Sequence, residues 1–239
     1  MPARDEEELI GAAIEAHAYQ RGVQAGDFEL IVVLDVCADD TEGQVERAAS
    51  RHPHLRITVL HGPGGGAGPA RRVGMDAAYD RLEGAGLIAC TDADSTVASD
   101  WVGAQLRAMA LGAHAIGGRI ELHPADRDRL GPDVMADRAA RQAARHQRVI
   151  ADPGPPGSTA EHWQFSGASL AVTAKTYLRV GGMVPAAALE DEAFESTLIR
   201  HGVPIHRSLA VQVTTSGRLV GRAEAGLAKD LAAAAARRG

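Results

Sequence analysis

Two carboxylates one residue apart, directly after an apolar run, offer the clearest chemistry in this chain. Residues 87–90 are Leu-Ile-Ala-Cys, and Asp92 and Asp94 follow them at D-x-D spacing. In an open α/β sheet, ligands bind beyond the carboxyl ends of the strands. Two carboxylates held together there repel each other, and a divalent cation removes that repulsion. Mg²⁺ or Mn²⁺ would complete its coordination with water and substrate phosphates.

On spacing alone, each acidic segment also has a purely structural interpretation. Asp92 would cap the following turn while its neighbour stays solvated, since short motif matches carry a real false-positive risk. The Leu-Glu-Asp-Glu run at 189–192 would be an acidic first helical turn, which the helix dipole favours. Asp35 closes another apolar run, residues 28–36, so it would reach the same edge of a parallel sheet as Asp92.

The elements that must position these acids alternate along the chain. Apolar, β-branched runs predict strands at 28–36, 55–60, 86–90 and 115–123, one strand within 166–182 and one or two within 203–215. Periodicity and turn signals predict helices at 5–22, 41–51, 69–82, 101–111, 132–150 and 189–202, a short helix before 182 and a helical tail from Arg222. Residues 151–162, rich in Pro and Gly, are expected to form a mobile loop. We predict a single α/β domain over residues 1–239, with a mainly parallel mixed sheet flanked by helices.

Composition limits the function classes. The chain has 239 residues, 45% apolar content and a net charge of −6, which disfavours nucleic acid and anionic membranes as general partners. Two cysteines without ligand spacing make neither a zinc site nor a disulfide framework. No apolar run approaches a membrane span, and the acidic start is unlike a signal peptide. The expectation is a cytoplasmic protein without a membrane span, and a homodimer stays open.

Six segments in order resemble the family 2 glycosyltransferases, which have the nucleotide-diphospho-sugar transferase (GT-A) fold. They are PARDEEE (2–8), VVLDVCADDT (32–41), GAGPARRVG (66–74), CTDADS (90–95), FSGASLAVTAKTYLRVGGM (165–183) and LEDEAF (189–194). Each is a weak match alone, but their order along most of the chain makes the resemblance specific. It implies metal-dependent, inverting transfer of a hexose from a nucleoside diphosphate sugar to a small soluble acceptor.

The resemblance also implies a nucleotide-binding half over residues 1–115. Its contacts would be Ala3, Arg4 and Glu6 at the base and ribose, Asp35 at the base, Arg71 at the nucleotide and Asp92 near the ribose. An acceptor-only carboxylate such as Asp35 suits the N–H of uracil or guanine equally well. Asp94, together with Asp92, would hold Mg²⁺ or Mn²⁺.

Residues 116–239 would form the acceptor-binding half. Asp191 would act as general base, taking the proton of an acceptor hydroxyl that attacks opposite the diphosphate. Glu190 and Glu192 flank it and, as like charges, are expected to make it more basic. Less specific acceptor or supporting candidates are Glu190, Glu192, Trp163, Gly167 and Arg218.

The chain also departs from the family pattern. The family's opening strand should precede PARDEEE, but this chain starts at Met1, so we expect a natural start upstream. Arg72 stands where the family often has Asn, and Val36 and Ala38 replace small or hydroxyl residues. These three positions are expected to alter nucleotide preference.

Several other residues leave two interpretations open. Four arginines spaced 3, 4 and 3 apart share one helix face and, with Arg127 and Arg129, would either receive an anionic acceptor or form a solvated face: Arg138, Arg141, Arg145 and Arg148. His206 would be a third metal ligand or a structural histidine. Arg218 and Arg222 would reach the diphosphate or stay at the surface. Leu227 and Leu231 would dock on the domain or on a second copy.

Other function classes remain as alternatives. GPGGGA (62–67) formally fits a dinucleotide-binding turn, but it contains Pro63 and lacks a strand-end acid about 20 residues later, so NAD binding is disfavoured. A nucleotide-binding pseudoenzyme, a retaining sugar transferase and a nucleotidyltransferase stay open. Turnover, product stereochemistry and the phosphate donor would separate them.

Overall fold

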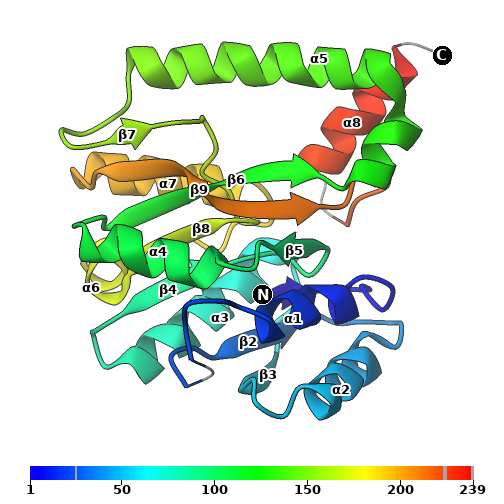
Figure 1. Ribbon diagram of the computed structural model, residues 1–239, viewed down its shortest axis with the longest axis vertical. Helices are drawn as coiled ribbons and strands as arrows, with labels where there is room; N and C mark the ends of the chain where they lie inside the picture. Colours follow the sequence, from blue (N-terminus) through cyan, green and yellow to red (C-terminus); the bar gives the residue numbers. More distant parts are fainter. Residues whose placement is uncertain (25, 223–224, 238–239) are drawn as a thin grey trace.

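The computed structural model describes residues 1–24, 26–222 and 225–237, and it shows strands enclosed by helices (Figure 1). The strands are β1 (Pro2–Ala3), β2 (Leu30–Leu34), β3 (Ile57–His61), β4 (Leu87–Cys90), β5 (Ser95–Val97), β6 (Ala115–Leu122), β7 (Thr159–Ala160), β8 (Leu170–Thr173) and β9 (Ile205–Thr215). The helices are α1 (Ile10–Ala18), α2 (Thr41–Arg51), α3 (Ala67–Leu82), α4 (Trp101–Ala110), α5 (Pro124–Ala151), α6 (Ala174–Arg179), α7 (Glu190–Arg200) and α8 (Leu227–Ala236).

The α/β class is confirmed, and the strands form two hydrogen-bonded sheets. One sheet is parallel, in the order β1-β2-β3. The other is mixed, in the order β4-β8-β6-β9-β5, with β7 paired to β9. β1 spans only Pro2 and Ala3 and pairs with β2 alone, so no backbone ladder crosses from β1 to β4.

The β2 strand is buried on both faces because its side chains alternate between two apolar layers. Val32 packs toward α1 and α2, against Ile14 and Val45. Its neighbour Val33 faces α3 and packs with Ala70. A strand that is covered by helices on both sides reads as a continuous apolar run, and this explains why β2 could be predicted.

The first helix is shorter than the 5–22 predicted from sequence. Asp5 has a φ of 53°, which no helix tolerates, and α1 begins only at Ile10. The acids before it hold the loop after β2 instead, since the Asp5 carboxylate accepts the Ala38 amide at 2.7 Å. The Glu6 amide donates to the Thr41 hydroxyl at 2.8 Å. The acidic run therefore binds the loop after β2 and the start of α2, and it does not form a first helical turn.

The second half contains other differences from the sequence prediction. α5 begins at Pro124, before the predicted Pro132, and Gly131 breaks it with a φ of 77°. β5, which follows the D-x-D pair, was not predicted because it spans only three residues. Residues 152–158 carry no helix or strand, but the predicted loop, 151–162, also includes the end of α5 and the strand β7.

The chain ends on α8, which packs against α5 through Leu227, Leu231 and Val134, so the tail docks on its own domain. The predicted tail helix started at Arg222, and residues 223–224 of that prediction lie outside the described residues. None of the helices described here combines the length and the apolar character that a bilayer-spanning segment requires.

Candidate active site

A cleft of about 880 Å³ brings together most of the site residues that the sequence predicts. They are Ala3, Arg4, Glu6, Asp35, Arg71, Asp92, Asp94, Trp163, Gly167, Glu190, Asp191, Glu192 and Arg218. These residues come from strand ends of both sheets, from the segment between β7 and β8, from the starts of α3 and α7, and from the segment after β9. The carboxyl ends of β2 and β4 thus open onto one site, as an α/β topology requires.

Asp35, at the end of β2, is held by the glycine-rich turn before α3. Its buried carboxylate accepts the amide of Gly64 at 2.8 Å and that of Gly66 at 3.2 Å. Gly62 has to be glycine for this arrangement, since an added Cβ would lie 2.6 Å from the Asp35 carboxylate. The next residue, Val36, has a φ of 56°, an outlier for a β-branched side chain.

Arg71 on α3 joins three parts of the cleft. Its guanidinium donates to Asp92 at 2.8 Å, to Glu190 at 3.1 Å and to the Gly167 carbonyl at 2.9 Å. Burial alone would lower the pKa of Arg71, but the Asp92 and Glu190 carboxylates raise it, so this buried cation keeps its charge. An added Cβ at Gly167 would lie 2.4 Å from the guanidinium, so the glycine permits this close approach.

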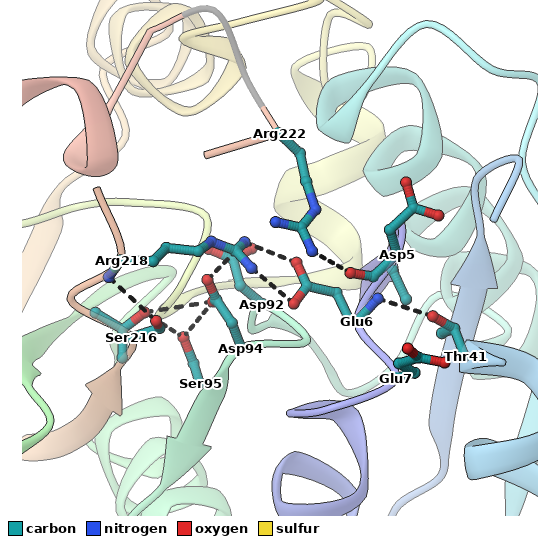
Figure 2. A network of polar contacts seen from close by, with 12 residues as sticks. Asp5, Glu6, Glu7, Thr41, Asp92, Asp94, Ser95, Ser216, Arg218 and Arg222 are labelled. Atoms are coloured by element: carbon teal, nitrogen blue, oxygen red, sulfur yellow. Dashed lines mark hydrogen bonds and ion pairs between the residues drawn. The ribbon is translucent and has the colours of Figure 1, made fainter. Parts of the chain in front are cut away.

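Asp94 and Glu6 share Arg218, which reaches back from the segment after β9 (Figure 2). Arg218 binds Glu6 through both terminal nitrogens, at 2.8 and 2.7 Å, and lies 2.9 Å from Asp94. Ser95 donates to the Asp94 carboxylate at 3.3 Å. Burial and the neighbouring Asp92 raise the pKa of Asp94 to about 6, which Arg218 partly opposes.

Asp191 stands at the start of α7, oriented by backbone amides. Its two carboxylate oxygens accept the amides of Gly167 at 3.0 Å and of Glu192 at 2.9 Å. Leu189, at the helix N-cap, has a φ of 56°, which turns the chain sharply before the helix. The two flanking acids differ, because Glu190 is buried against Arg71 and only Glu192 is exposed as a free like charge.

Asp92 and Asp94 are the residues with the chemistry to hold a divalent cation. Within the described parts of the chain, no group of three or more His, Cys, Asp or Glu side chains is arranged as a metal site. Two carboxylates with open coordination positions fit Mg²⁺ or Mn²⁺, which keep water and phosphate oxygens as their remaining ligands. The donor set therefore fits a cation that arrives with a diphosphate.

Several flagged residues lie outside the cleft. His206, near the start of β9, pairs with Ile116, and Thr215, beside Asp94 at its end, pairs with Leu122. These partners are six residues apart on β6, roughly 20 Å at 3.3 Å per residue, so His206 lies too far from Asp94 to ligate the same metal ion. Arg72 binds Asp76 at 2.5 Å and the Met183 carbonyl at 2.7 Å, which holds it outside the cleft. Arg127 lines a separate, smaller hollow along α5.

Sequence reasoning missed the groups that support these side chains. Thr215 donates to the Asp94 carboxylate at 3.4 Å and pairs with Ser95 across β9 and β5. Glu195, one helical turn after Asp191, forms an ion pair with the buried Arg207. Glu195 could have been found from the sequence, because it lies four residues after Asp191 on the same face of the helix. Thr215 could not, because its pairing with a distant strand leaves no local sequence pattern.

One comparison with known proteins identifies a family. The model of the family described as glycosyl transferase family 2 matches residues 1–167. No curated protein matches the sequence. Solved structures nevertheless share the fold, as the following three show.

A mannosyltransferase, PcManGT from Pyrobaculum calidifontis, in complex with GDP-Man and Mn²⁺, aligns with a TM-score of 0.66 and 19% identity, over 90% of this chain and 55% of that one. S. aureus TarS 1–349 in complex with UDP-GlcNAc aligns with a TM-score of 0.65 and 15% identity, over 95% of this chain and 59% of that one. Glucosyl-3-phosphoglycerate synthase from Mycobacterium tuberculosis, with Mn²⁺, UDP-Glc and phosphoglyceric acid, aligns with a TM-score of 0.54 and 16% identity, over 91% of this chain and 70% of that one. The chain thus spans little more than half the length of the first two.

Proposed function

Because the chain belongs to glycosyl transferase family 2, we propose that it moves a hexose from a nucleoside diphosphate sugar to a small acceptor, with inversion and with a divalent cation. The observation that carries this proposal is the convergence of four acids in one cleft. Asp35, the pair Asp92 and Asp94, and Asp191 come from three separate segments and line the same hollow. An inverting transfer of this kind needs acids in three roles: to bind the nucleobase, to hold the metal ion and to accept the proton of the acceptor hydroxyl.

The donor would lie against residues 1–115. Asp35 is positioned by two glycine amides, and each of its oxygens keeps a lone pair for an N–H of the base. Ala3, Arg4 and Glu6 line the adjoining wall, where the ribose would sit. Arg71 keeps its charge through two carboxylates and so would steady Asp92 beside the nucleotide.

Asp94 and Asp92 would hold the cation. Mn²⁺ accompanies the nucleotide sugar in two of the similar structures, which supports such a cation here. When bound, it would neutralise the charge that develops on the leaving diphosphate. Arg218 lies 2.9 Å from Asp94, so its guanidinium would add to that neutralisation from the protein side.

Asp191 would accept the proton of the acceptor hydroxyl. Two backbone amides fix its carboxylate, so its remaining lone pairs would face the cleft in a constant orientation. The hydroxyl would attack the anomeric carbon as the bond to the diphosphate breaks, and its proton would pass to Asp191. A single displacement of this kind inverts the anomeric configuration and needs no covalent intermediate. Residues 116–239 would thus form the acceptor half.

Calorimetric titration with UDP and with GDP, each with and without Mn²⁺, tests the donor site. We expect one nucleotide to bind with Mn²⁺ and to bind at least about tenfold more weakly without it, or when Asp94→Asn removes a metal-ligand charge. Asp128→Asn is the matched control, since this exposed acid on α5 lies outside the cleft. A folded protein that binds neither nucleotide would reject the proposal.

Product stereochemistry tests the mechanism once a donor is known. Slow hydrolysis of the donor in ²H₂O, followed by NMR, reports the configuration of the first-formed sugar. Inversion is expected, and retention would exclude the role given to Asp191. Asp191→Asn should lower turnover by at least about a hundredfold while nucleotide affinity stays close to that of the wild type.

A further inference from the structure

One wall of the cleft is basic. Arg138, Arg141, Arg145 and Arg148, called here the arginine stripe, all line the cleft. They project from one face of α5, the long helix drawn across the top of Figure 1. Among the described residues of this helix only Val134 is buried, so packing does not explain the stripe.

Little within the described residues neutralises the stripe. Arg141 alone has an ion pair there, with Asp137 at 3.2 Å, and Asp137 also binds Arg237 at 3.0 Å. Arg145 stacks on Trp163, with its guanidinium carbon 4.6 Å from the ring centre. Arg138 and Arg148 form no ion pair with any described residue. The wall therefore carries an excess of positive charge toward the cleft.

Arg138 lies among like charges that its acidic neighbours only partly offset. Burial lowers the pKa of Arg138, and Arg141 and Arg145 lower it further, against the opposing effect of Glu121 and Asp230. Like charges on one helix face destabilise it. A bound anion would remove this repulsion, and guanidinium groups match phosphate and carboxylate in geometry.

The diphosphate of the proposed donor would have cationic partners elsewhere in the cleft. Arg71 lies 2.8 Å from Asp92, and Arg218 lies 2.9 Å from Asp94. These two arginines and the cation would surround a diphosphate beside the D-x-D pair. The stripe therefore faces a different negative group, on the molecule that shares the cleft with the donor.

We propose that the arginine stripe binds a phosphate or carboxylate group carried by the acceptor, an inference that rests on the proposed function. A negatively charged acceptor would otherwise be repelled as its hydroxyl approached Asp191 and Glu192, which line the same cleft. The stripe offsets that repulsion and orients the hydroxyl toward Asp191. Trp163, stacked under Arg145, forms the adjoining surface.

Titration with three related alcohols tests this assignment. Glycerol 3-phosphate, glycerate and glycerol differ in their anionic group, and each is titrated with and without Mn²⁺ and the nucleotide that binds. Calorimetry and tryptophan fluorescence both report binding, because Trp163 lies in the cleft whereas Trp101 is buried elsewhere. We expect at least one of the two anions to bind in a salt-dependent manner and glycerol not to bind.

Vesicles separate a soluble acceptor from a lipid headgroup. Co-sedimentation is measured with phosphatidylglycerol vesicles, whose surface is anionic, and with phosphatidylcholine vesicles, whose surface has no net charge. Both lipids carry a phosphate group. Binding of glycerol 3-phosphate or glycerate alone supports a soluble acceptor, and stripe-dependent binding to phosphatidylglycerol supports a lipid-linked one. If neither soluble anion nor anionic vesicle binds, the proposal is overturned.

A double variant and a charge-matched control complete the test. Arg138→Gln/Arg148→Gln should weaken anion binding at least tenfold, whereas Arg127→Gln/Arg179→Gln changes exposed arginines outside the cleft and should leave it unaltered. Equal binding by both double variants overturns the proposal. So does loss of nucleotide affinity in the stripe variant, because the stripe would then belong to the donor site. Nucleotide binding, measured first and alone, reports separately on the proposed function.

Discussion

The buried and partly buried acids of the cleft are each met by a guanidinium or by backbone amides, and this pairing lets them gather without a ligand. Glu190 and Asp92 share Arg71, and Glu6 and Asp94 share Arg218. Asp35 and Asp191 instead accept backbone amides. A buried charge without such partners would shift its pKa or destabilise the fold.

Removing the Arg71 guanidinium should therefore destabilise the protein strongly. Arg71→Met would leave Glu190 buried without its partner and Asp92 partly so, with side-chain exposures of 8% and 34%. We expect the free energy of unfolding to fall by about 3 kcal/mol, as measured by urea denaturation. Because the cost comes from the stranded carboxylate, Arg71→Met/Glu190→Gln should recover part of it. A double variant no more stable than the single one would contradict this explanation.

His17 should make stability depend on pH. Its Nδ1 hydrogen-bonds the Ala13 carbonyl at 2.8 Å while Nε2 is buried without a partner, and burial lowers the pKa from 6.5 to about 4. The folded pKa lies below the unfolded one, so this contribution is complete above about pH 6.5 and is lost as the pH falls toward 4.

We expect His17 to account for about 2 kcal/mol of lost stability between pH 7 and pH 5. Urea denaturation at both pH values, compared with His17→Phe, measures it. Burial also lowers the pKa of His162 to about 4, so the pH dependence should shrink in the variant without vanishing. An unchanged dependence would show that His17 is protonated at little cost.

At this scale, sequence reasoning could name the site residues but not their partners. The order of the acidic and glycine-rich segments predicted that Asp35, Asp94 and Asp191 belong together. The pairing of Glu190 with Arg71 was beyond it, because α3 and α7 are 119 residues apart at this contact. Such pairings follow from the packing of elements, which no local pattern records.

At the scale of elements, the glycine-rich start of α3 shows how closely the helix approaches the segment before α7. An added Cβ at Gly68 would lie 1.8 Å from the Ala186 carbonyl oxygen, a backbone atom that cannot turn aside. Gly11, within α1, would meet nothing nearer than the Arg51 side chain at 3.9 Å. The two helical glycines therefore differ in what a methyl group would do.

Alanine at these two positions should have opposite effects on stability. Gly11→Ala should raise the free energy of unfolding by about 0.5–1 kcal/mol, because alanine loses less backbone entropy in a helix. Gly68→Ala should lower it by about 2 kcal/mol or more through overpacking, and should also weaken nucleotide binding by displacing the turn beside Asp35. Thermal or chemical denaturation measures the free energy of unfolding of both variants. If Gly68→Ala were stabilising, α3 would be able to move away from the Ala186 carbonyl at little cost.

The elements themselves were predictable where local and tertiary signals agree. The residues of α2 matched the prediction, Thr41–Arg51, since its apolar stripe and its ends coincide. α1 was predicted too long because Asp5, Glu6 and Glu7 resemble a favourable first helical turn. In the structure these residues instead form hydrogen bonds with the segment between β2 and α2. β5 was missed because pairing with β9, about 120 residues later, creates it.

On the scale of the whole molecule, the cleft joins two sheets that share no backbone ladder. The first sheet contributes Glu6 and Asp35 through the segments after β1 and β2, and the second contributes Asp94. Arg218 ties them, since it bridges Glu6 near the start of the chain to Asp94 (Figure 2). A nucleotide and its cation would cross the same boundary.

Arg218 should consequently have opposite effects on the free cation and on the nucleotide complex. Without nucleotide, its guanidinium occupies the Asp94 carboxylate and repels Mn²⁺, so Arg218→Gln should bind Mn²⁺ alone several-fold more tightly, by electron paramagnetic resonance titration. With nucleotide, the diphosphate gives Arg218 an anionic partner, and the same variant should bind the nucleotide–Mn²⁺ complex about tenfold more weakly, by calorimetry. Weakening of both would mean that Arg218 only maintains the fold of the cleft, and tightening of both would mean that it only blocks the site. Opposite signs require that one side chain hold the two sheets together in the free protein and the leaving group in the complex.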